Sequence, residues 1–290
     1  MNTIAVTLRH YYTLTKPGII RGNVMTAVAG FLFASQGNIN LVLLIQTVFG
    51  IASIIASACV INNYIDRDID SKMTRTKKRA LVTGDISVRN ALIYATLLCV
   101  IGFWVLWAYT NLLTVLIGAI GMFSYVALYG YYKRNSVHGT LVGSISGSTA
   151  LVAGYCAVTG RFDMLALLLF IIMSIWQMPH FYAIGIYKLK DYKQASLPIL
   201  PAISGVRVTK KHIAVYILLF TFAASSLTLF GYTGYVYLFV MLAVSLLWLR
   251  TALRGFAMKD NVKYGHQIFG QSLITLLLFS LMISVDHYLP

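Results

Sequence analysis

The sequence has no glutamate and little charge of either sign. Charged residues make up 11% of its 290 residues, whereas hydrophobic residues make up 59% and the mean hydropathy is +0.77. Because a soluble domain carries about 25% charged residues, this composition excludes an ordinary soluble enzyme and a disordered chain. All eight acidic residues are aspartates. Each aspartate that stands at a membrane edge is therefore a candidate for function.

Cysteine is scarce as well. Cys59, Cys99 and Cys156 each lie inside an apolar run, their number is odd, and their spacing fits no metal motif. We therefore expect buried free thiols and no disulfide. The net charge of +15 would suit nucleic acid, but the basic residues stand between long apolar runs. A membrane surface accounts for them better, and we predict no nucleic-acid partner.

Long apolar runs dominate the rest of the sequence. A helix needs about 20 apolar residues to cross a bilayer, and several runs are apolar on every side, unlike the alternating strands of a membrane barrel. We predict an all-α polytopic membrane protein, with a single domain over residues 1–290. The nine predicted spans are 19–37, 41–64, 88–108, 111–131, 138–158, 162–184, 212–230, 233–253 and 266–286.

The basic residues predict the orientation of the chain. Segments on one side of the predicted membrane hold 22 of the 23 lysines and arginines, and the other side holds only Arg161. The positive-inside rule places the N-terminus in the cytoplasm, and an odd number of spans places the C-terminus outside. The two long loops, about 65–87 and 185–211, are then cytoplasmic. We expect the chemistry at the cytoplasmic edge.

The first apolar run has two interpretations. It has a basic flank, as a cleaved signal peptide does, but its polar lead is long and no clear small-residue cleavage site follows near Ala34. We expect a retained helix. Since no arginine-rich and serine-rich transit peptide precedes it, the sequence favours a bacterial plasma (inner) membrane over an organelle.

The second span ends in a cluster of acidic and amide side chains. Asn62, Asp66 and Asp70 are spaced four residues apart, so on a helix they fall within an arc of about 80°. Asn63 lies near the same face, whereas Asp68 points the other way. Carboxylate and amide oxygens suit Mg²⁺, which often takes one or two carboxylates plus substrate phosphates. A solvated helix cap would explain one aspartate, but the alignment favours a metal site.

A dense basic run follows the acidic cluster directly. It could attract anionic lipid, but that attraction does not explain the aligned acids beside it. A diphosphate bound through a metal explains both the acids and the bases. The metal binds some of the diphosphate oxygens, and arginines bind others through paired hydrogen bonds. With an apolar cavity above this edge, we predict a prenyl diphosphate whose allylic C–O bond ionises. The basic residues are Lys72, Arg75, Lys77, Lys78 and Arg79.

The wider sequence resembles a known family. Its acidic cluster is similar to the first acidic motif of the UbiA-type intramembrane prenyltransferases. Two later segments narrow the resemblance to the haem-farnesylating branch, and the likeness extends from about residue 10 to the last helix. The segments that carry it are Thr15–Gly18, Asn62–Asp70, Met73–Arg79, Leu81–Gly84, Trp176–His180 and Lys190–Tyr192.

This resemblance implies a fold, a reaction and a set of partners. The UbiA-type prenyltransferase fold has nine helices around a central cavity and a cytoplasmic active site. Its haem branch joins the farnesyl group of farnesyl diphosphate to a vinyl group of haem b, with addition of water, and gives haem O and diphosphate. The implied cofactor is Mg²⁺. The implied partners are farnesyl diphosphate, haem b, the lipid bilayer and downstream haem-modifying or terminal oxidase proteins.

We expect the metal and the diphosphate to share one site. Asp66, Asp70 and Asn62 would hold the metal, and Asn63 would complete the catalytic cluster. Lys16 either precedes the first helix as part of an ordinary helix start or faces the diphosphate. The side chains expected around the diphosphate are Arg75, Lys78, Arg79, Lys190 and Asp191.

Haem binding is expected to involve a histidine and the cationic rim. His180 either ligates or orients the haem iron or hydrogen-bonds to a neighbouring helix. Haem carries two propionates, so basic residues at the rim are candidate partners, although the positive-inside rule accounts for each of them more simply. These candidates are Arg21, Lys133, Arg134 and Lys188.

The sequence departs from the family in three places. Segment 187–192 holds one acid, Asp191, whereas many relatives carry a pair of aspartates there. The sequence therefore does not predict a second metal site, and the positive charge of Lys188 or Lys190 could replace that metal. Ala150 and Leu151 replace usual prolines in the fifth span. Because proline kinks a helix, we expect this span to be straighter. The usual proline is also replaced at position 80, by Ala80.

Two classes of rival function stay open, one enzymatic and one non-enzymatic. A UbiA-type prenyltransferase with another acceptor, such as a quinone-precursor aromatic acid or another tetrapyrrole, would share the acidic motif. A non-enzymatic transporter should show polar residues near mid-membrane or repeat symmetry, whereas the ionisable groups here lie at one rim. An oxidase assembly subunit would tolerate loss of Asp66 and Asp70.

Overall fold

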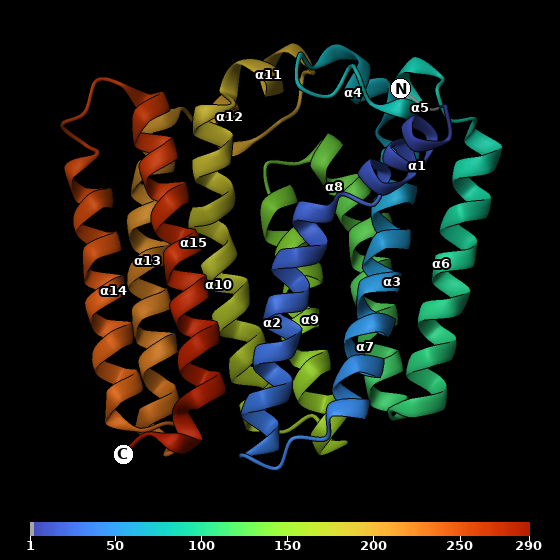
Figure 1. Cartoon of the computed structure of the whole chain (residues 1–290). Helices are drawn as coiled ribbons and strands as arrows, with labels where there is room; N and C mark the ends of the chain where they lie inside the picture. Colours follow the sequence, from blue (N-terminus) through green and yellow to red (C-terminus); the bar gives the residue numbers. More distant parts are fainter. Residues whose placement is uncertain (1–2) are drawn as a thin grey trace.

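The computed structural model describes residues 3–290, and the secondary structure in this part of the chain is helical. Within the described residues, nine helical segments are long and apolar enough to cross a membrane, and they stand side by side in one bundle (Figure 1). Their bounds are α2 Pro17–Ser35, α3 Leu41–Ile65, α6 Val88–Tyr109, α7 Leu112–Phe123 continued by the π-helix η1 Ser124–Tyr129 and α8 Gly130–Asn135, α9 Gly139–Thr159, α10 Met164–Tyr187, α13 Val206–Leu229, α14 Tyr235–Arg254 and α15 Asn261–Val285. The predicted all-α architecture is confirmed.

Two spans begin at least five residues earlier than predicted. The seventh begins at Val206 rather than at 212, and the ninth begins at Asn261 rather than at 266. Both predicted spans began after a group of charged residues, whereas the helices include these residues. In α13 one of the charges is accommodated because a lysine donates to backbone carbonyl oxygens. Lys210 Nζ donates to the carbonyl oxygen of Gly255 at 2.8 Å, at the end of α14. This contact also places a cation at a helix C-terminus, where the helix dipole favours it.

Short helices collect at one end of the bundle. In Figure 1 they form the upper layer near the N-terminus, and the C-terminus lies at the opposite end. This separation of the termini agrees with an odd number of spans. The short helices are α1 Thr3–Leu14, α4 Arg67–Lys72, α5 Ala80–Thr83, α11 Leu189–Gln194 and α12 Leu200–Ile203, and the 3₁₀ helix η2 Asp286–Tyr288 follows α15 at the other end.

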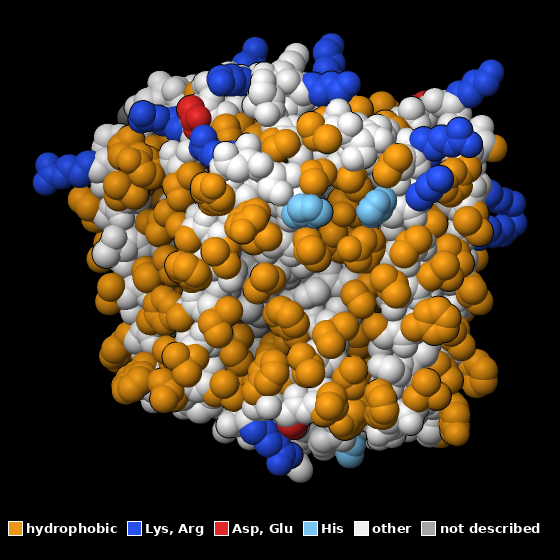
Figure 2. All heavy atoms as spheres, turned by 180° about the vertical axis from the view of Figure 1, so that it is seen from behind, with side chains coloured by type: hydrophobic (Ala, Val, Ile, Leu, Met, Phe, Trp, Pro, Cys, Tyr) orange, Lys and Arg blue, Asp and Glu red, His pale blue; other side chains and the backbone are white. Residues whose placement is uncertain are grey.

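The outside of the bundle is apolar. Large side chains stay exposed there, for example Trp107 at 66%, Phe222 at 73% and Leu229 at 79%. On the face shown in Figure 2, hydrophobic side chains form a broad band, and lysines and arginines gather at the end that carries the short helices. Soluble monomers rarely expose large contiguous apolar patches. The chain is an integral membrane protein.

Glycine lets two central helices approach closely. A Cβ on Gly154 of α9 would lie 2.0 Å from the carbonyl oxygen of Ala27 in α2. A Cβ on Gly30 of α2 would lie 2.1 Å from the carbonyl oxygen of Leu151. Backbone atoms make both contacts, so a side-chain rotation cannot relieve them. Small residues allow such close packing in lipid, and the α2–α9 pair depends on glycine at both positions.

Three features of the sequence can now be placed. α9 runs as one helix through Ala150 and Leu151, as expected for a span without prolines. Ala80 is the first residue of α5, a position that accepts proline because its N–H needs no partner within the helix. The three cysteines are free, as predicted, and two are buried. Cys99 is only half-buried because it lies on the outer helix α6.

Candidate functional site

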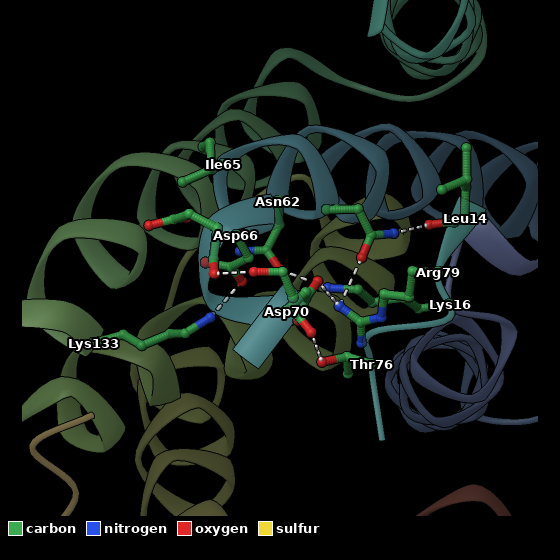
Figure 3. A network of polar contacts seen from close by, with 12 residues as sticks. Leu14, Lys16, Asn62, Ile65, Asp66, Asp70, Thr76, Arg79 and Lys133 are labelled. Atoms are coloured by element: carbon green, nitrogen blue, oxygen red, sulfur yellow. Dashed lines mark hydrogen bonds and ion pairs between the residues drawn. The ribbon is translucent and has the colours of Figure 1, made fainter. Parts of the chain in front are cut away.

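The acidic cluster lies where α3 meets α4, at the end of the bundle that carries the short helices (Figure 3). The expectation of one continuous helix is wrong, because α3 ends at Ile65 and α4 begins at Arg67. The N–H of Asp66, between them, still bonds to the Asn62 carbonyl oxygen at 2.9 Å, and the Asp70 N–H bonds to the Asp66 carbonyl oxygen at 2.8 Å. The four-residue spacing therefore survives the junction, and all three predicted metal ligands are buried.

Asp66 is held by two cations from the end of the fourth span. The Lys133 ammonium forms an ion pair with Asp66 Oδ2, and Arg134 Nη2 lies 3.7 Å from Oδ1. Arg134 also donates to the carbonyl oxygen of Ile65 at the C-terminus of α3. Only 3% of the Asp66 side chain is exposed. A carboxylate buried this deeply would carry a large desolvation penalty without such partners.

Asp70 is held from the opposite side. Arg79 forms an ion pair with Asp70 Oδ2 and donates to Asn63 Oδ1 at 3.0 Å. The intervening loop folds back because the buried Thr76 hydroxyl donates to the Asp70 carbonyl oxygen at 2.9 Å. Asn63 in turn donates to the carbonyl oxygen of Leu14 at 2.7 Å, which fastens the end of α1 to α3. Arg79 thus lies against the acidic cluster, as expected.

Lys16 reaches the same cluster from the turn between α1 and α2. Its backbone is left-handed, with φ 52° and ψ 66°, a conformation that costs a non-glycine residue about 1–3 kcal/mol. In this turn the side chain points at the cluster, and Nζ donates to Asn62 Oδ1. Burial of the ammonium lowers the pKa of Lys16 to about 8, and the nearby charge of Arg79 acts in the same direction. Lys16 therefore both precedes α2 and faces the site.

Asp68 points away from the cluster, as predicted. Its side chain is 62% exposed and accepts hydrogen bonds from Arg134 at 2.9 and 2.8 Å. This forked contact lowers the pKa of Asp68 to about 2. Asp68 thereby fixes Arg134, which reaches the buried Asp66 and the end of α3.

A π-helix that the sequence analysis did not predict forms one wall of the cluster. In η1 the rings of Tyr125 and Tyr129 stack with their centres 5.7 Å apart. The Tyr125 hydroxyl lies 3.4 Å from Asn62 Oδ1, and Lys133 Nζ lies 5.6 Å from the centre of the Tyr129 ring. π-helical segments occur frequently at functional sites. Here the segment brings two aromatic rings beside the carboxylates.

The two long loops meet over this end of the bundle, where α4 and α11 lie in the upper layer of Figure 1. Ile69 and Met73 of the first loop pack with Ala195 and Leu197 of the second in a buried apolar cluster. This contact joins the two loops into a cover. A cover over the acidic cluster limits the access of bulk water, which strengthens electrostatic interactions beneath it.

The other residues expected around the diphosphate lie further out. Arg75 and Lys78 are exposed and line a pocket on the outer side of Arg79. Lys190 is exposed on α11, and Asp191 is half-buried beside it. In the described part of the chain, none of these four side chains forms a salt bridge with Asp66 or Asp70. Arg79 is the residue of that group which contacts the carboxylates.

His180 contacts a neighbouring helix. Its Nδ1 lies 2.8 Å from Ser272 Oγ of α15, and its ring lies between Trp176 and Phe269, with ring centres 4.9 and 4.8 Å away. Trp176 Nε1 also donates to the carbonyl oxygen of Ser272 at 3.0 Å. The Trp176–His180 run therefore joins α10 to α15, which is the second of the two interpretations. A role for His180 toward haem stays a prediction.

The basic haem candidates separate into two groups. Lys133 and Arg134 are engaged with the acidic cluster, so they are not free rim charges. Arg21 is exposed on α2, and Lys188 is half-buried at the end of α10. Burial lowers the pKa of Lys188, and the nearby charge of Arg75 lowers it further. The charge of Arg75 on the first loop therefore acts on Lys188 at the start of the second loop.

The donor set of the cluster fits a magnesium ion. Asp66 Oδ1 is buried and accepts no hydrogen bond from the described residues. In the same part of the chain, no three carboxylate, histidine or cysteine side chains converge as a complete metal cage. Mg²⁺ seldom needs such a cage, because substrate phosphates and water supply the remaining oxygens. Two carboxylates and one amide oxygen are protein ligands of the kind that such a complex takes.

Comparison with known proteins places the chain in a family. The model of the UbiA prenyltransferase family matches residues 23–273. The chain belongs to the UbiA prenyltransferase family. It is 50% identical over 283 residues to protoheme IX farnesyltransferases of Citrobacter koseri and Salmonella arizonae, covering 97% of this chain and 96% of each relative. A protoheme IX farnesyltransferase of Escherichia coli O1:K1 / APEC is similar to the same extent.

Solved structures share the fold at low sequence identity. A structure of digeranylgeranylglyceryl phosphate synthase matches 97% of this chain and 98% of its own, with a TM-score of 0.79 and 18% identity. A UbiA homologue from Archaeoglobus fulgidus bound to GPP and Mg²⁺ matches 95% of this chain and all of its own, with a TM-score of 0.69 and 18% identity. The UbiA-type fold is confirmed.

Some residues of the site carried only a weak sequence signal. Lys133 and Arg134 stand together at the cytoplasmic end of the fourth span, which marks them as rim charges but not as partners of Asp66. Tyr125 and Tyr129 are two among 19 tyrosines. Their four-residue spacing is that of one helix face. The π-helix that places them has no evident sequence signature.

Proposed function

We propose that the chain transfers the farnesyl group of farnesyl diphosphate to a vinyl group of haem b, with addition of water, to give haem O and diphosphate. The observation that carries this proposal is the buried Asn62–Asp66–Asp70 cluster with its four surrounding cations, in a chain half identical to protoheme IX farnesyltransferases. The reaction is expected in a bacterial inner membrane. The cluster would lie at its cytoplasmic face.

The metal in this proposal is Mg²⁺, held by Asp66, Asp70 and the Asn62 amide. When bound, it would supply positive charge against the diphosphate oxygens. A UbiA homologue of the same fold binds Mg²⁺ together with GPP, which supports this assignment. Asp66 Oδ1, which is buried and accepts no hydrogen bond from the described residues, supports it independently.

The cations of the chain would stabilise the leaving group. Negative charge grows on the diphosphate as the allylic C–O bond breaks, and a preorganised positive field lowers the energy of that state. Arg79, Lys133 and Lys16 already converge on the cluster. Arginine suits this role because its fork binds two phosphate oxygens at once.

The protein must also protect the allylic cation until the vinyl group attacks. The farnesyl chain is expected to lie among the apolar helices, while the diphosphate stays at the rim. The stacked Tyr125 and Tyr129 rings offer their faces close to the cluster, and aromatic faces attract cations. The cover formed by the two loops limits premature capture by bulk water. Controlled access is required, because one water molecule supplies the hydroxyl of the product.

The experiment that tests the proposal is haem extraction. The chain is expressed in a bacterial host that lacks haem O synthase, and haems are separated by chromatography with mass detection. From the wild type we expect a species heavier than haem b by one farnesyl group and one hydroxyl, because a vinyl group of haem b becomes a hydroxyethylfarnesyl group. It should be absent from Asp66→Ala and Asp70→Ala proteins that are inserted in the membrane, because each lacks a carboxylate of the metal site.

Asp85 provides the matched control. It is an exposed aspartate on the loop after α5, where it accepts a hydrogen bond from Thr83. Asp85→Ala should leave the haem O yield unchanged. Normal haem O from Asp66→Ala would overturn the site assignment. Haem b alone from inserted wild type would point to a different acceptor.

A further inference from the structure

A second cationic feature lies beside the acidic cluster. A pocket of about 370 Å³ opens on the outer side of Arg79. Helix α1 forms one wall with Arg9 and His10, and the segment after α4 forms the other with Arg75 and Lys78. Among the described residues that line it, none is acidic. The pocket therefore gathers five basic side chains from two segments far apart in the sequence.

Most of these basic side chains have no partner of opposite charge. Arg79 is paired with Asp70, but Arg9, His10, Arg75 and Lys78 form no salt bridge within the described part of the chain. The positive charges of Arg9, Arg75 and Lys78, held together without a counter-charge, repel one another. A bound anion would relieve this repulsion. The diphosphate has other cations already, since Lys16 and Lys133 lie on the carboxylate side.

The position of the pocket indicates which anion it takes. Arg79 lies between the pocket and Asp70, so a ligand in the pocket is one side chain away from the proposed reaction site. Arg75, which lines the pocket, stands two positions after Met73, and Met73 packs in the apolar contact between the two loops. The pocket thus lies at the edge of the cover rather than on a remote surface.

We propose that this pocket binds the propionate carboxylates of the haem acceptor. The inference rests on the proposed function and names a substrate subsite within it. Two ionised propionates need at least two cations, and arginines bind carboxylates through paired hydrogen bonds. The vinyl groups of protohaem lie on the edge of the macrocycle remote from its propionates. Anchoring the propionates at the rim leaves the vinyl edge free to face the farnesyl group.

A phospholipid phosphate shares the anionic chemistry of a propionate. Helix α1 exposes Leu8 and Tyr12, so it lies where lipid is within reach. A single headgroup phosphate would leave most of the unpaired cations unmatched, and it would not explain why the pocket borders Arg79. The double cationic wall therefore favours a ligand with two carboxylates.

The test is an equilibrium titration that needs no turnover. Haem b and protohaem dimethyl ester, in which both carboxylates are blocked, are titrated by absorbance into the full chain in nanodiscs of phosphatidylcholine. We expect the wild type to bind haem b about tenfold more tightly than the ester, as charged hydrogen bonds allow. The double variant Arg9→Gln with Lys78→Gln should bind both forms equally, at the affinity of the ester.

Lys77→Gln is the control, since Lys77 is exposed on the same loop but does not line the pocket. It should keep the tenfold preference. Equal binding of haem b and its ester by the wild type, or an undiminished preference in the double variant, would overturn the subsite. An effect of the double variant that appears only when phosphatidylglycerol is added would assign the pocket to a lipid phosphate instead, which also overturns it.

Turnover separates this proposal from the proposed function. If the wild type makes haem O but the titration shows no preference, the subsite fails alone. If the preference is present but no haem O forms, the proposed function fails alone. In an active enzyme the double variant should raise KM for haem b about tenfold and leave KM for farnesyl diphosphate unchanged.

Discussion

Asn62 and Asn63 are neighbours in the sequence but point to different surroundings. Asn62 accepts a hydrogen bond from Lys16 and lies beside the Tyr125 hydroxyl, so it faces the proposed metal and diphosphate. Asn63 connects Arg79 to the carbonyl oxygen of Leu14. It therefore holds α1 and the guanidinium in place, and we infer a positioning role for it rather than a place among the metal ligands.

Replacing Asn63 should loosen α1. In Asn63→Ala the buried carbonyl oxygen of Leu14 loses its donor, which costs about 1–3 kcal/mol. Hydrogen exchange measured by mass spectrometry should accelerate over residues 3–16. Asn135→Ala is the control, because Asn135 is exposed and bonds only to Tyr131 in its own helix. Unchanged exchange of α1 in Asn63→Ala would show that other contacts hold this helix.

The candidate site is formed by residues at the ends of several helices of the bundle. α3 and α4 provide the carboxylates, the end of the fourth span provides two cations and two tyrosines, and the turn before α2 provides Lys16. These side chains meet only if the helices keep their heights, that is, their positions along the bundle axis, relative to one another. The close α2–α9 contact at Gly30 and Gly154 fixes one such height, because a backbone-to-backbone contact leaves no freedom to slide.

A methyl group at Gly154 should therefore weaken the bundle. Gly154→Ala places a Cβ 2.0 Å from a carbonyl oxygen, so the helices must separate, at a cost of about 1–3 kcal/mol. The midpoint of thermal unfolding in detergent should fall. Gly270→Ala in α15 is the matched control, since nothing lies within 4 Å of a Cβ there. An equal midpoint for both variants would contradict the packing argument.

At the scale of the whole molecule, charge and shape give the protein two different ends. The end with the short helices carries the acidic cluster, the cover and nearly all the basic residues, whereas Arg161 lies at the other end. The positive-inside rule predicts that the first end is cytoplasmic. Both polar parts of the proposed substrates, the diphosphate and the propionates, would then be handled on the cytoplasmic side.

Cysteine labelling tests this orientation. Asn38 lies in the loop between α2 and α3, away from the cluster, and Lys77 lies in the first long loop. A membrane-impermeant maleimide should label Asn38→Cys in intact right-side-out spheroplasts and label Lys77→Cys only after the membrane is opened. The wild type gives the background from its three native thiols. The reverse pattern would place the site outside.

The amino-acid sequence by itself determined the class of the protein and the core of its site. Nine apolar runs are local features, and the bilayer makes each of them a helix because backbone groups in lipid must bond within their own segment. The unequal distribution of basic residues predicted one charged end. The four-residue spacing of Asn62, Asp66 and Asp70 is also local, and it brings three candidate oxygen ligands together independently of how the helices pack.

Tertiary structure decided which partners meet the carboxylates. Lys133 is 67 positions from Asp66 and Lys16 is 46 from Asn62, so no local pattern could pair them. Packing also turned Asn63 toward α1, joined His180 to α15, and moved Arg75 and Lys78 into the pocket with Arg9. These choices depend on the relative heights and rotations of separate helices. Side-chain contacts between helices set those heights and rotations, and a single sequence does not show such contacts.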